Sequence, residues 1–158
     1  YPLAYYCAYY SIRANAFDYE KMAMGRERLE YYINDYKAKK ADGTISNVED
    51  DELKDMRIVQ EMYARGFEFV PIDIYKAKAR SFQIIDGKIM PSFASIAGMG
   101  LKAAQQLEEA AKGGTFTSKE DIRIRGKVSK TILDVMEELG ILGDLPETNQ
   151  YDFFGMLK

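Results

Sequence analysis

The chain of 158 residues falls within the size of one to two domains, and 47% hydrophobic with 30% charged residues is ordinary for a globular protein. The formal net charge of -3 excludes a generally basic nucleic-acid binder, so any contact with DNA must come from a local patch. A single cysteine excludes an internal disulfide framework, and the absence of histidine removes the usual zinc-site spacings and histidine proton relays. No apolar run is long enough to cross a membrane, so we expect a cytoplasmic location and no membrane partner.

The first part of the chain predicts three helices. Apolar and aromatic side chains cover nearly all sides of a helix over residues 3–16, which is typical of an element buried against other helices. A second helix is expected from residue 19 to about 40, capped by Asp18. A third begins at the capping box Ser46-Asn47-Val48-Glu49 and ends at Gly66.

A small β element follows. Apolar residues flank Asp86-Gly87, and this pattern predicts a type I′ β-hairpin made by residues 81–85 and 88–90. Residues 91–95 predict one short helical turn. The expected fold class is therefore mainly α with a small β-hairpin.

The segment Ile96-Ala97-Gly98-Met99-Gly100 leads directly into an amphipathic helix that ends near Lys112. Glycines at positions 98 and 100 permit positive φ and let another backbone approach closely. The first amides of the helix, its dipole and Lys102 would then face an anion. The pattern resembles the helix-hairpin-helix motif, which binds the nucleic-acid backbone without recognising sequence. The same residues also fit a helix that simply begins after a glycine turn.

A second helix, turn and helix follow the first. The capping box Thr117-Ser118-Lys119-Glu120 opens a short helix that ends at Arg125, and Ser129 caps a helix over residues 130–139. Basic residues gather around the turn between them, although they also fit ordinary solvated helix faces. Two such units pack as a pseudo-symmetric module, which favours binding to the duplex backbone. The predicted DNA-binding residues are Gly98, Met99, Gly100, Lys102, Arg125, Lys127, Ser129 and Lys130.

The order of the segments resembles the C-terminal end of the PolC-type alpha subunit of bacterial DNA polymerase III. The likeness covers essentially the whole chain and is carried by Tyr1 to Tyr6, by Pro91 to Ala104 and by Glu138 to Pro146. It implies that residues 1–65 are the helical end of the polymerase fingers and that residues 66–145 are a tandem helix-hairpin-helix module. The catalytic aspartates of that family lie in an upstream palm domain. We therefore expect no catalytic residue, metal ligand or cofactor in this chain, and Mg²⁺ in the parent polymerase.

The last segment, residues 146–158, resembles the family's tail that binds the sliding clamp, the beta subunit. The implied clamp-binding residues are Gln150, Tyr151, Asp152, Phe153 and Phe154, with aromatic rings at two positions where leucine is common. An apolar tail that folds back on its own domain is the alternative.

These patterns predict part of a replicative DNA polymerase that binds duplex DNA and tethers the enzyme to its clamp. The alternatives are a free-standing helix-hairpin-helix module of the repair or recombination type, and a purely structural interaction domain. The first helix separates them, because a self-contained module would not leave residues 3–16 apolar on nearly all sides.

Overall fold

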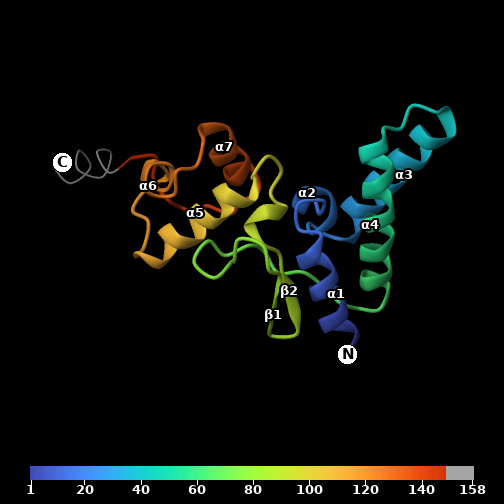
Figure 1. Cartoon of the computed structure of the whole chain (residues 1–158), viewed down its shortest axis with the longest axis horizontal. Coiled ribbons are helices and arrows are strands. Elements are labelled where there is room, and N and C mark those ends of the chain that lie inside the picture. The colour runs from blue at the N-terminus through green and yellow to red at the C-terminus, as the bar shows by residue number, and fades with distance from the viewer. Residues whose placement is uncertain (149–158) are drawn as a thin grey trace.

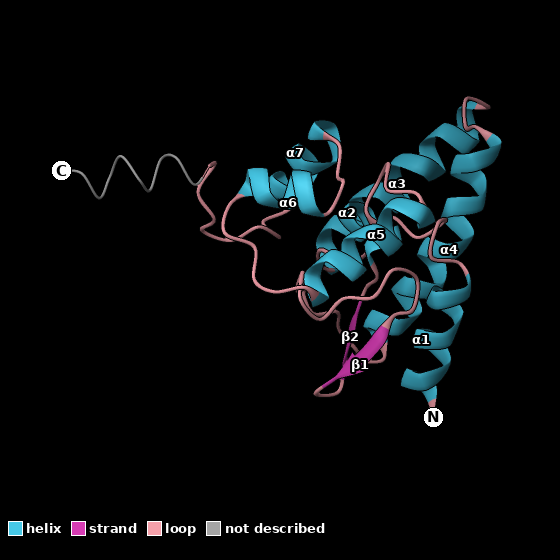
Figure 2. Ribbon diagram, turned by 60° about the vertical axis from the view of Figure 1, so that its left-hand side comes forward, coloured by secondary structure: helices cyan, strands magenta, loops and turns pink. Residues whose placement is uncertain are grey.

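The computed structural model describes residues 1–148 and is mainly helical, with one small antiparallel hairpin, which confirms the predicted fold class (Figures 1 and 2). The pair α3 and α4 lies at one end of the molecule, and α5 to α7 lie together at the other (Figure 1). In chain order the elements are α1 (Pro2–Ile12), α2 (Tyr19–Met22), α3 (Arg26–Asp42), α4 (Asn47–Ala64), β1 (Gln83–Ile85), β2 (Lys88–Met90), the 3-10 turn η1 (Phe93–Ser95), α5 (Leu101–Lys112), α6 (Lys119–Arg125) and α7 (Lys130–Glu138).

The single helix expected from residue 19 to about 40 is instead two helices, α2 and α3. Asp18 does cap the first, because its Oδ1 accepts a hydrogen bond from the Lys21 N–H at 3.1 Å. The chain then breaks at Gly25, whose φ of +110° lies outside the right-handed helical region. The glycine therefore separates two helices that packing afterwards places side by side.

Two local predictions are confirmed in detail. The Ser46 hydroxyl accepts a hydrogen bond from the Glu49 N–H, and the Glu49 carboxylate accepts one from the Ser46 N–H, each at 3.1 Å. In the β-hairpin, Asp86 and Gly87 have φ values of +51° and +77°, as a type I′ turn requires. Gln83 consequently lies opposite Met90 in the antiparallel pair.

An aromatic cluster joins α1 to the β-hairpin. The buried rings of Tyr10, Phe17 and Phe82 have centroids 4.9 to 5.7 Å apart. Contacts of this kind contribute energy beyond the burial of their area. The opposite side of α1 is open, since Tyr5 is 62% and Ile12 is 72% exposed. The helix is therefore apolar on all sides, as predicted, but it is not buried on all of them.

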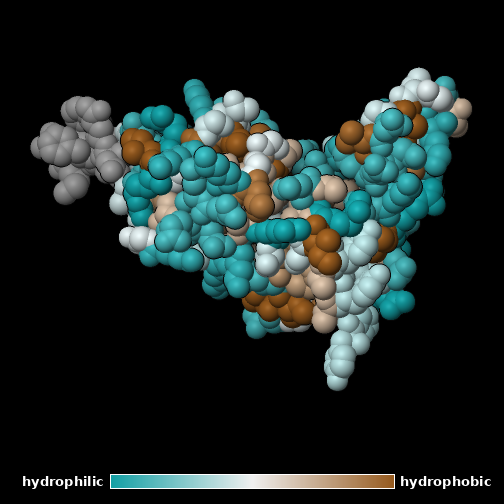
Figure 3. Space-filling view, in the orientation of Figure 1, coloured by the Kyte–Doolittle hydropathy of each residue, from teal (hydrophilic) through white to brown (hydrophobic). Residues whose placement is uncertain are grey.

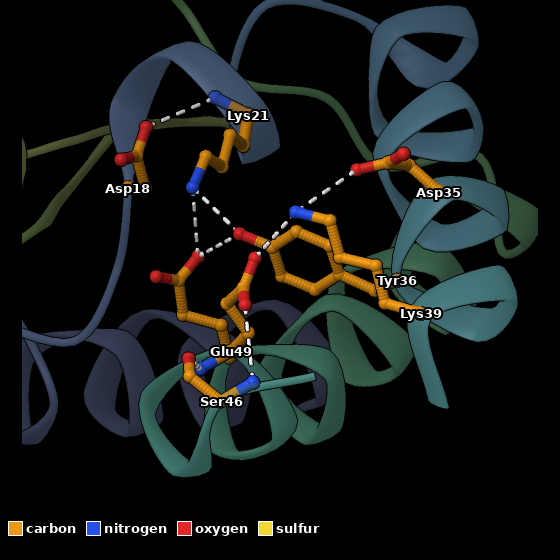
Figure 4. A network of polar contacts seen from close by, with 8 residues as sticks. Asp18, Lys21, Asp35, Tyr36, Lys39, Ser46 and Glu49 are labelled. Carbon is orange, nitrogen blue, oxygen red and sulfur yellow. Dashed lines mark hydrogen bonds and ion pairs between the residues drawn. The ribbon is translucent and has the colours of Figure 1, made fainter. Parts of the chain in front are cut away.

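A polar network ties α2 to the pair α3 and α4 (Figure 4). The Lys21 ammonium donates to the Tyr36 hydroxyl at 2.6 Å and lies 3.3 Å from Glu52, and the Tyr36 hydroxyl donates to Glu52 at 3.0 Å. On the same side, the Lys39 ammonium lies 2.8 Å from the Glu49 carboxylate. Partly buried, charge-assisted contacts of this kind fix the three helices relative to one another.

Because the pKa of the Glu49 carboxylate is lowered in the folded chain, we expect the stability of the fold to depend on pH. The Lys39 ammonium and then the Ser46 N–H lower the pKa of Glu49 to about 2, below its unfolded value of about 4.3. The ionised form therefore stabilises the fold above the unfolded pKa, and this contribution is lost as the pH falls through the folded value. We expect the melting-temperature difference between wild type and Glu49→Gln to be constant near neutral pH and to shrink between about pH 4.3 and 2.

The Ser46→Ala variant is the matched control for this measurement. It loses the cap but keeps the Glu49–Lys39 ion pair, so it should cost about 1 kcal/mol near neutral pH. This cost should vary with acid pH less than the Glu49→Gln difference, because the Ser46 hydroxyl contributes less than Lys39 to lowering the pKa of Glu49. A Glu49→Gln difference that does not vary with pH would contradict the assigned ion pair.

Candidate nucleic-acid interface

Hairpin 1, residues 96–100, turns the chain from η1 into α5. Gly98 has a φ of +83°, and Met99, 4% exposed, donates its N–H to the Ile96 carbonyl at 3.0 Å. Gly100 has φ -71° and ψ 165°, so the prediction of positive φ is wrong for this glycine. The reason is that Gly100 is the N-cap of α5, where an extended backbone lets its carbonyl accept the first helical bond from the Ala104 N–H.

Hairpin 2, residues 125–129, repeats this backbone without the glycine pair. Lys127 has a φ of +54° and occupies the place of Gly98 relative to the following helix. Val128, 4% exposed, then occupies the place of Met99, and Ser129 is the extended N-cap of α7. The two turns therefore share the same sequence of a left-handed residue, a buried apolar residue and an extended cap.

The two hairpins lie against each other within one module. A Cβ atom built on Gly98 would be 4.0 Å from Cγ1 of Ile132 in the first turn of α7. Leu107 of α5, Ile122 of α6 and Met136 of α7 are fully buried in the shared core. The helix starts that follow the two turns are thus held by common packing.

The start of α5 differs from those of α6 and α7. Ser118 and Ser129 cap the latter two, whereas the N-cap of α5 is Gly100, which has no side chain to offer. The first amides of α5 consequently have no side-chain cap among the described residues, and Lys102 stands exposed beside them. Free helix amides and a nearby cation form the usual arrangement for binding an anion.

Comparison with known proteins agrees with this geometry. A family model described as "Helix-hairpin-helix motif" matches residues 66–151. The chain belongs to this helix-hairpin-helix family. Hairpins 1 and 2 both lie within the matched residues.

The whole chain is also similar to proteins named DNA polymerase III PolC-type, as the sequence resemblance predicted. It is 41% identical to the one from Streptococcus pneumoniae serotype 2 over 156 residues, which is 99% of this chain and 11% of that protein. Identity is 42% over 153 residues to the one from Streptococcus suis and 40% over 153 residues to that of Streptococcus pyogenes serotype M5. Each of these covers 97% of this chain, which spans about a tenth of the length of such relatives.

The cap of α6 lies one residue later in the helix-hairpin-helix module than predicted. The Ser118 hydroxyl, rather than that of Thr117, accepts a hydrogen bond from the N–H three residues on, that of Asp121, at 3.0 Å. The Asp121 carboxylate in turn accepts the Thr117 N–H at 3.0 Å. Two overlapping pairs at the same spacing, Thr117 with Glu120 and Ser118 with Asp121, explain the error.

Arg125, predicted to contact DNA, is held by its own chain. Its Nη1 donates to the Thr115 carbonyl and to Asp121, and its Nη2 donates to the Ala110 and Gly114 carbonyls, all at 3.0 to 3.1 Å. The guanidinium also lies 4.6 Å from the centroid of the Phe116 ring. Its hydrogen bonds thus connect α6 to α5 and to the loop between them, while the contact of Arg125 with DNA stays a prediction.

Three predicted lysines remain available for phosphate. Lys102, Lys127 and Lys130 are exposed, and none has an ion pair within residues 1–148. Lys119, by contrast, pairs with Glu137 and Glu147. Figure 3 shows hydrophilic side chains over most of the surface that α5 to α7 present in this view.

The remaining predictions concern the tail, metals and membranes. The five clamp-binding residues, Gln150 to Phe154, lie outside the described residues. Across residues 1–148, His, Cys, Asp and Glu side chains form no group of three or more suited to a metal ion. That part of the chain also contains no helix with the length and apolar character of a membrane span.

The different backbone of the two glycines predicts different tolerance to substitution. Gly98→Ala should lower the free energy of unfolding by about 1 kcal/mol, because an L residue is strained at positive φ. Gly100→Ala should change it by less than about 0.5 kcal/mol, since its φ is ordinary and, apart from its chain neighbours, no described residue comes within 4 Å of the new Cβ. Urea unfolding of the two variants measures this, and equal destabilisation would contradict the assigned turn.

The four hydrogen bonds of Arg125 predict that its substitution lowers stability. Arg125→Lys keeps the charge but cannot satisfy four acceptors, so we expect a loss of about 2 kcal/mol in the free energy of unfolding. Arg123→Lys is the matched control, because Arg123 is exposed and makes a single pair, with Glu120, at 3.8 Å. Equal stability of the two variants would refute the structural role of Arg125.

Proposed function

We propose that the chain is part of a replicative DNA-directed DNA polymerase and that it binds the duplex backbone without sequence specificity. The observation that carries this proposal is the repeated turn geometry of hairpins 1 and 2, each leading into a helix start near an exposed lysine that has no ion pair among residues 1–148. Backbone amides and lysines contact phosphate oxygens, which are the same at every base pair. The names of the relatives support placing this module in a polymerase.

The roles proposed for the three segments follow from the similarity to the PolC-type polymerases. Residues 1–65 form the helical end of the fingers, residues 66–145 bind duplex DNA and residues 146–158 form the C-terminal tail. The catalytic aspartates and the Mg²⁺ that they hold belong to upstream parts of the polymerase, and the site of action is the cytoplasm. In this scheme the chain contributes DNA affinity and positioning rather than nucleotide transfer.

A polymerase segment is favoured over a free-standing repair module. The similarity to the PolC-type relatives extends through residues 1–65 as well as through the module, at 97 to 99% of this chain. The open face at the beginning of α1, where Tyr5 is exposed, is suited to packing against further polypeptide. Neither feature is needed by an independent DNA-binding module.

Duplex binding should weaken steeply with salt. Because each neutralised phosphate contributes about -0.9 to the slope of log affinity against log salt, a few contacts predict a slope of roughly -3 to -5. Lys102→Gln should reduce the magnitude of that slope by about 0.9. Fluorescence anisotropy with a labelled duplex of mixed sequence measures both.

Arg57→Gln is the matched control, since Arg57 is an exposed arginine of α4 and the substitution removes the same charge. Its slope should equal that of wild type. A wild-type affinity that is insensitive to salt, or that depends strongly on duplex sequence, would contradict backbone binding.

We further propose that Gln150 to Phe154 tether the polymerase to its sliding clamp. The support is the sequence of the tail, in which an apolar aromatic pair follows a glutamine whose amide can both donate and accept hydrogen bonds. An aromatic anchor in a partner's pocket supplies most of the energy of such a short contact. DNA held by the module would raise the effective concentration of the tail near a clamp that encircles the same duplex.

A truncation after Thr148 tests the tether. The full chain should bind purified clamp with a Kd on the order of micromolar, corresponding to about -8 kcal/mol. Phe154→Ala should remove on the order of 2 kcal/mol. Titration calorimetry compares them with the truncated chain, and equal binding by the full and truncated chains would show that the tail is not the tether.

A further inference from the structure

A hollow of about 430 Å³ lies beside the first turn of α5 and has two arginines in its wall. It is formed where the end of α1 meets the segment before β1 and the beginning of α5. Within residues 1–148, no Asp or Glu side chain lines it. The lining residues are Ile12, Arg13, Asn15, Ala16, Arg80 and Leu101.

Arg13 is held by one edge of its guanidinium. Its Nε lies 2.8 Å from Oδ1 of Asp55, and its Nη2 donates to Oδ2 at 3.1 Å. Asp55 is only 3% exposed and also accepts the Tyr9 hydroxyl at 3.0 Å, so the carboxylate is a fixed anchor. The Nη1 group of Arg13 has no partner within residues 1–148, and the side chain remains 42% exposed.

Arg80 approaches the hollow from the other side and is held by one exposed hydrogen bond. Its Nη2 donates to the Ile12 carbonyl at 3.2 Å, and it has no carboxylate partner in the described part of the chain. Its neighbours fix the backbone, because the Ala79 N–H donates to Glu108 of α5 and the Phe82 N–H donates to Ser11 of α1, at 2.7 and 2.8 Å. Two arginines with spare donors are thus prepositioned around one hollow.

We propose that this hollow takes a backbone phosphate of the DNA strand that hairpin 1 contacts, an inference that rests on the proposed function. Arginine donors in a fixed fork match the oxygens of a phosphate. Continuity with the interface supports the same ligand, since Arg13 also lines a cleft of about 530 Å³ whose other wall includes Gly98 and Gly100. Leu101, the first residue of α5, follows Gly100 directly and lines the hollow.

The distribution of charge indicates which way the DNA strand runs from hairpin 1. Asp51 and Glu52 line the cleft on the side of α4; Glu52 is paired with Lys21, and the exposed Asp51 carboxylate repels a phosphate there. Among the described residues no carboxylate lines the hollow beyond Arg13, and the Asp55 carboxylate behind it is paired with Arg13. The DNA contact therefore extends from hairpin 1 over the end of α1, and residues 1–65 contribute to binding together with the module.

Arg80→Gln in the full 158-residue chain tests this extension. It removes one exposed cation and one exposed hydrogen bond, so the fold should be retained, which thermal unfolding checks. Loss of one phosphate contact should reduce the magnitude of the salt slope by about 0.9, so the ratio of variant to wild-type Kd should fall about threefold between about 50 and 200 mM salt. Arg57→Gln again controls for the change in net charge.

Arg13 needs a paired substitution, because its removal alone would leave the buried Asp55 carboxylate without a partner. Arg13→Gln combined with Asp55→Asn removes both charges of the pair. We expect the same reduction in slope as for Arg80→Gln.

The possible results separate the two proposals. If Arg80→Gln binds DNA like Arg57→Gln while Lys102→Gln still lowers the slope, the hollow takes no DNA phosphate and the proposed function stands. If the wild-type chain shows no salt-dependent duplex binding, both proposals fail. Saturable binding of inorganic phosphate, together with control-like DNA binding by Arg80→Gln, would assign the hollow to a small phosphate compound and overturn the inference.

Discussion

The interface depends on one backbone constraint, a left-handed residue that reverses the chain before each of two helices. Gly98 adopts it without strain, whereas Lys127 does so at a cost of roughly 1 kcal/mol. The surrounding packing compensates that cost, because the next residues, Met99 and Val128, are buried in the shared core. Turn geometry is thus maintained by tertiary contacts in hairpin 2 and by glycine in hairpin 1, and each turn leads into the start of a helix.

Charge is distributed so that an acidic chain can meet an anionic ligand locally. Many carboxylates are engaged inside the fold, as Asp121 is with Arg125 and Asp55 is with Arg13. Lys102 and Lys127 are left without such partners in the described part of the chain. The net charge of -3 therefore limits the attraction of the chain as a whole to DNA without preventing a positive patch at the turns. An interface of this kind is expected to be sensitive to salt and to depend on few residues.

Elements set by local chemistry could be predicted from the sequence, and those set by packing could not. The Ser46 capping box, the Asp86-Gly87 turn and the Ser129 cap each depend on a few neighbouring residues and are confirmed. The break at Gly25 was missed because glycine is tolerated within a helical pattern, and the residues alone do not show where packing demands a turn. The structural contacts of Arg125 could not be foreseen, because the folded chain alone brings it to the carbonyls of Ala110 in α5 and of Gly114 and Thr115 in the loop after it.

Amide NMR chemical shifts during titration with duplex DNA of mixed sequence test the central claim most directly. Each amide reports on its own surroundings, so the measurement locates the contact rather than only detecting it. The largest shifts should occur over residues 98–103 and 127–131, with little change on α3. Shifts centred on the surface of α3 and α4, or the absence of shifts, would contradict a DNA contact made by the paired hairpins.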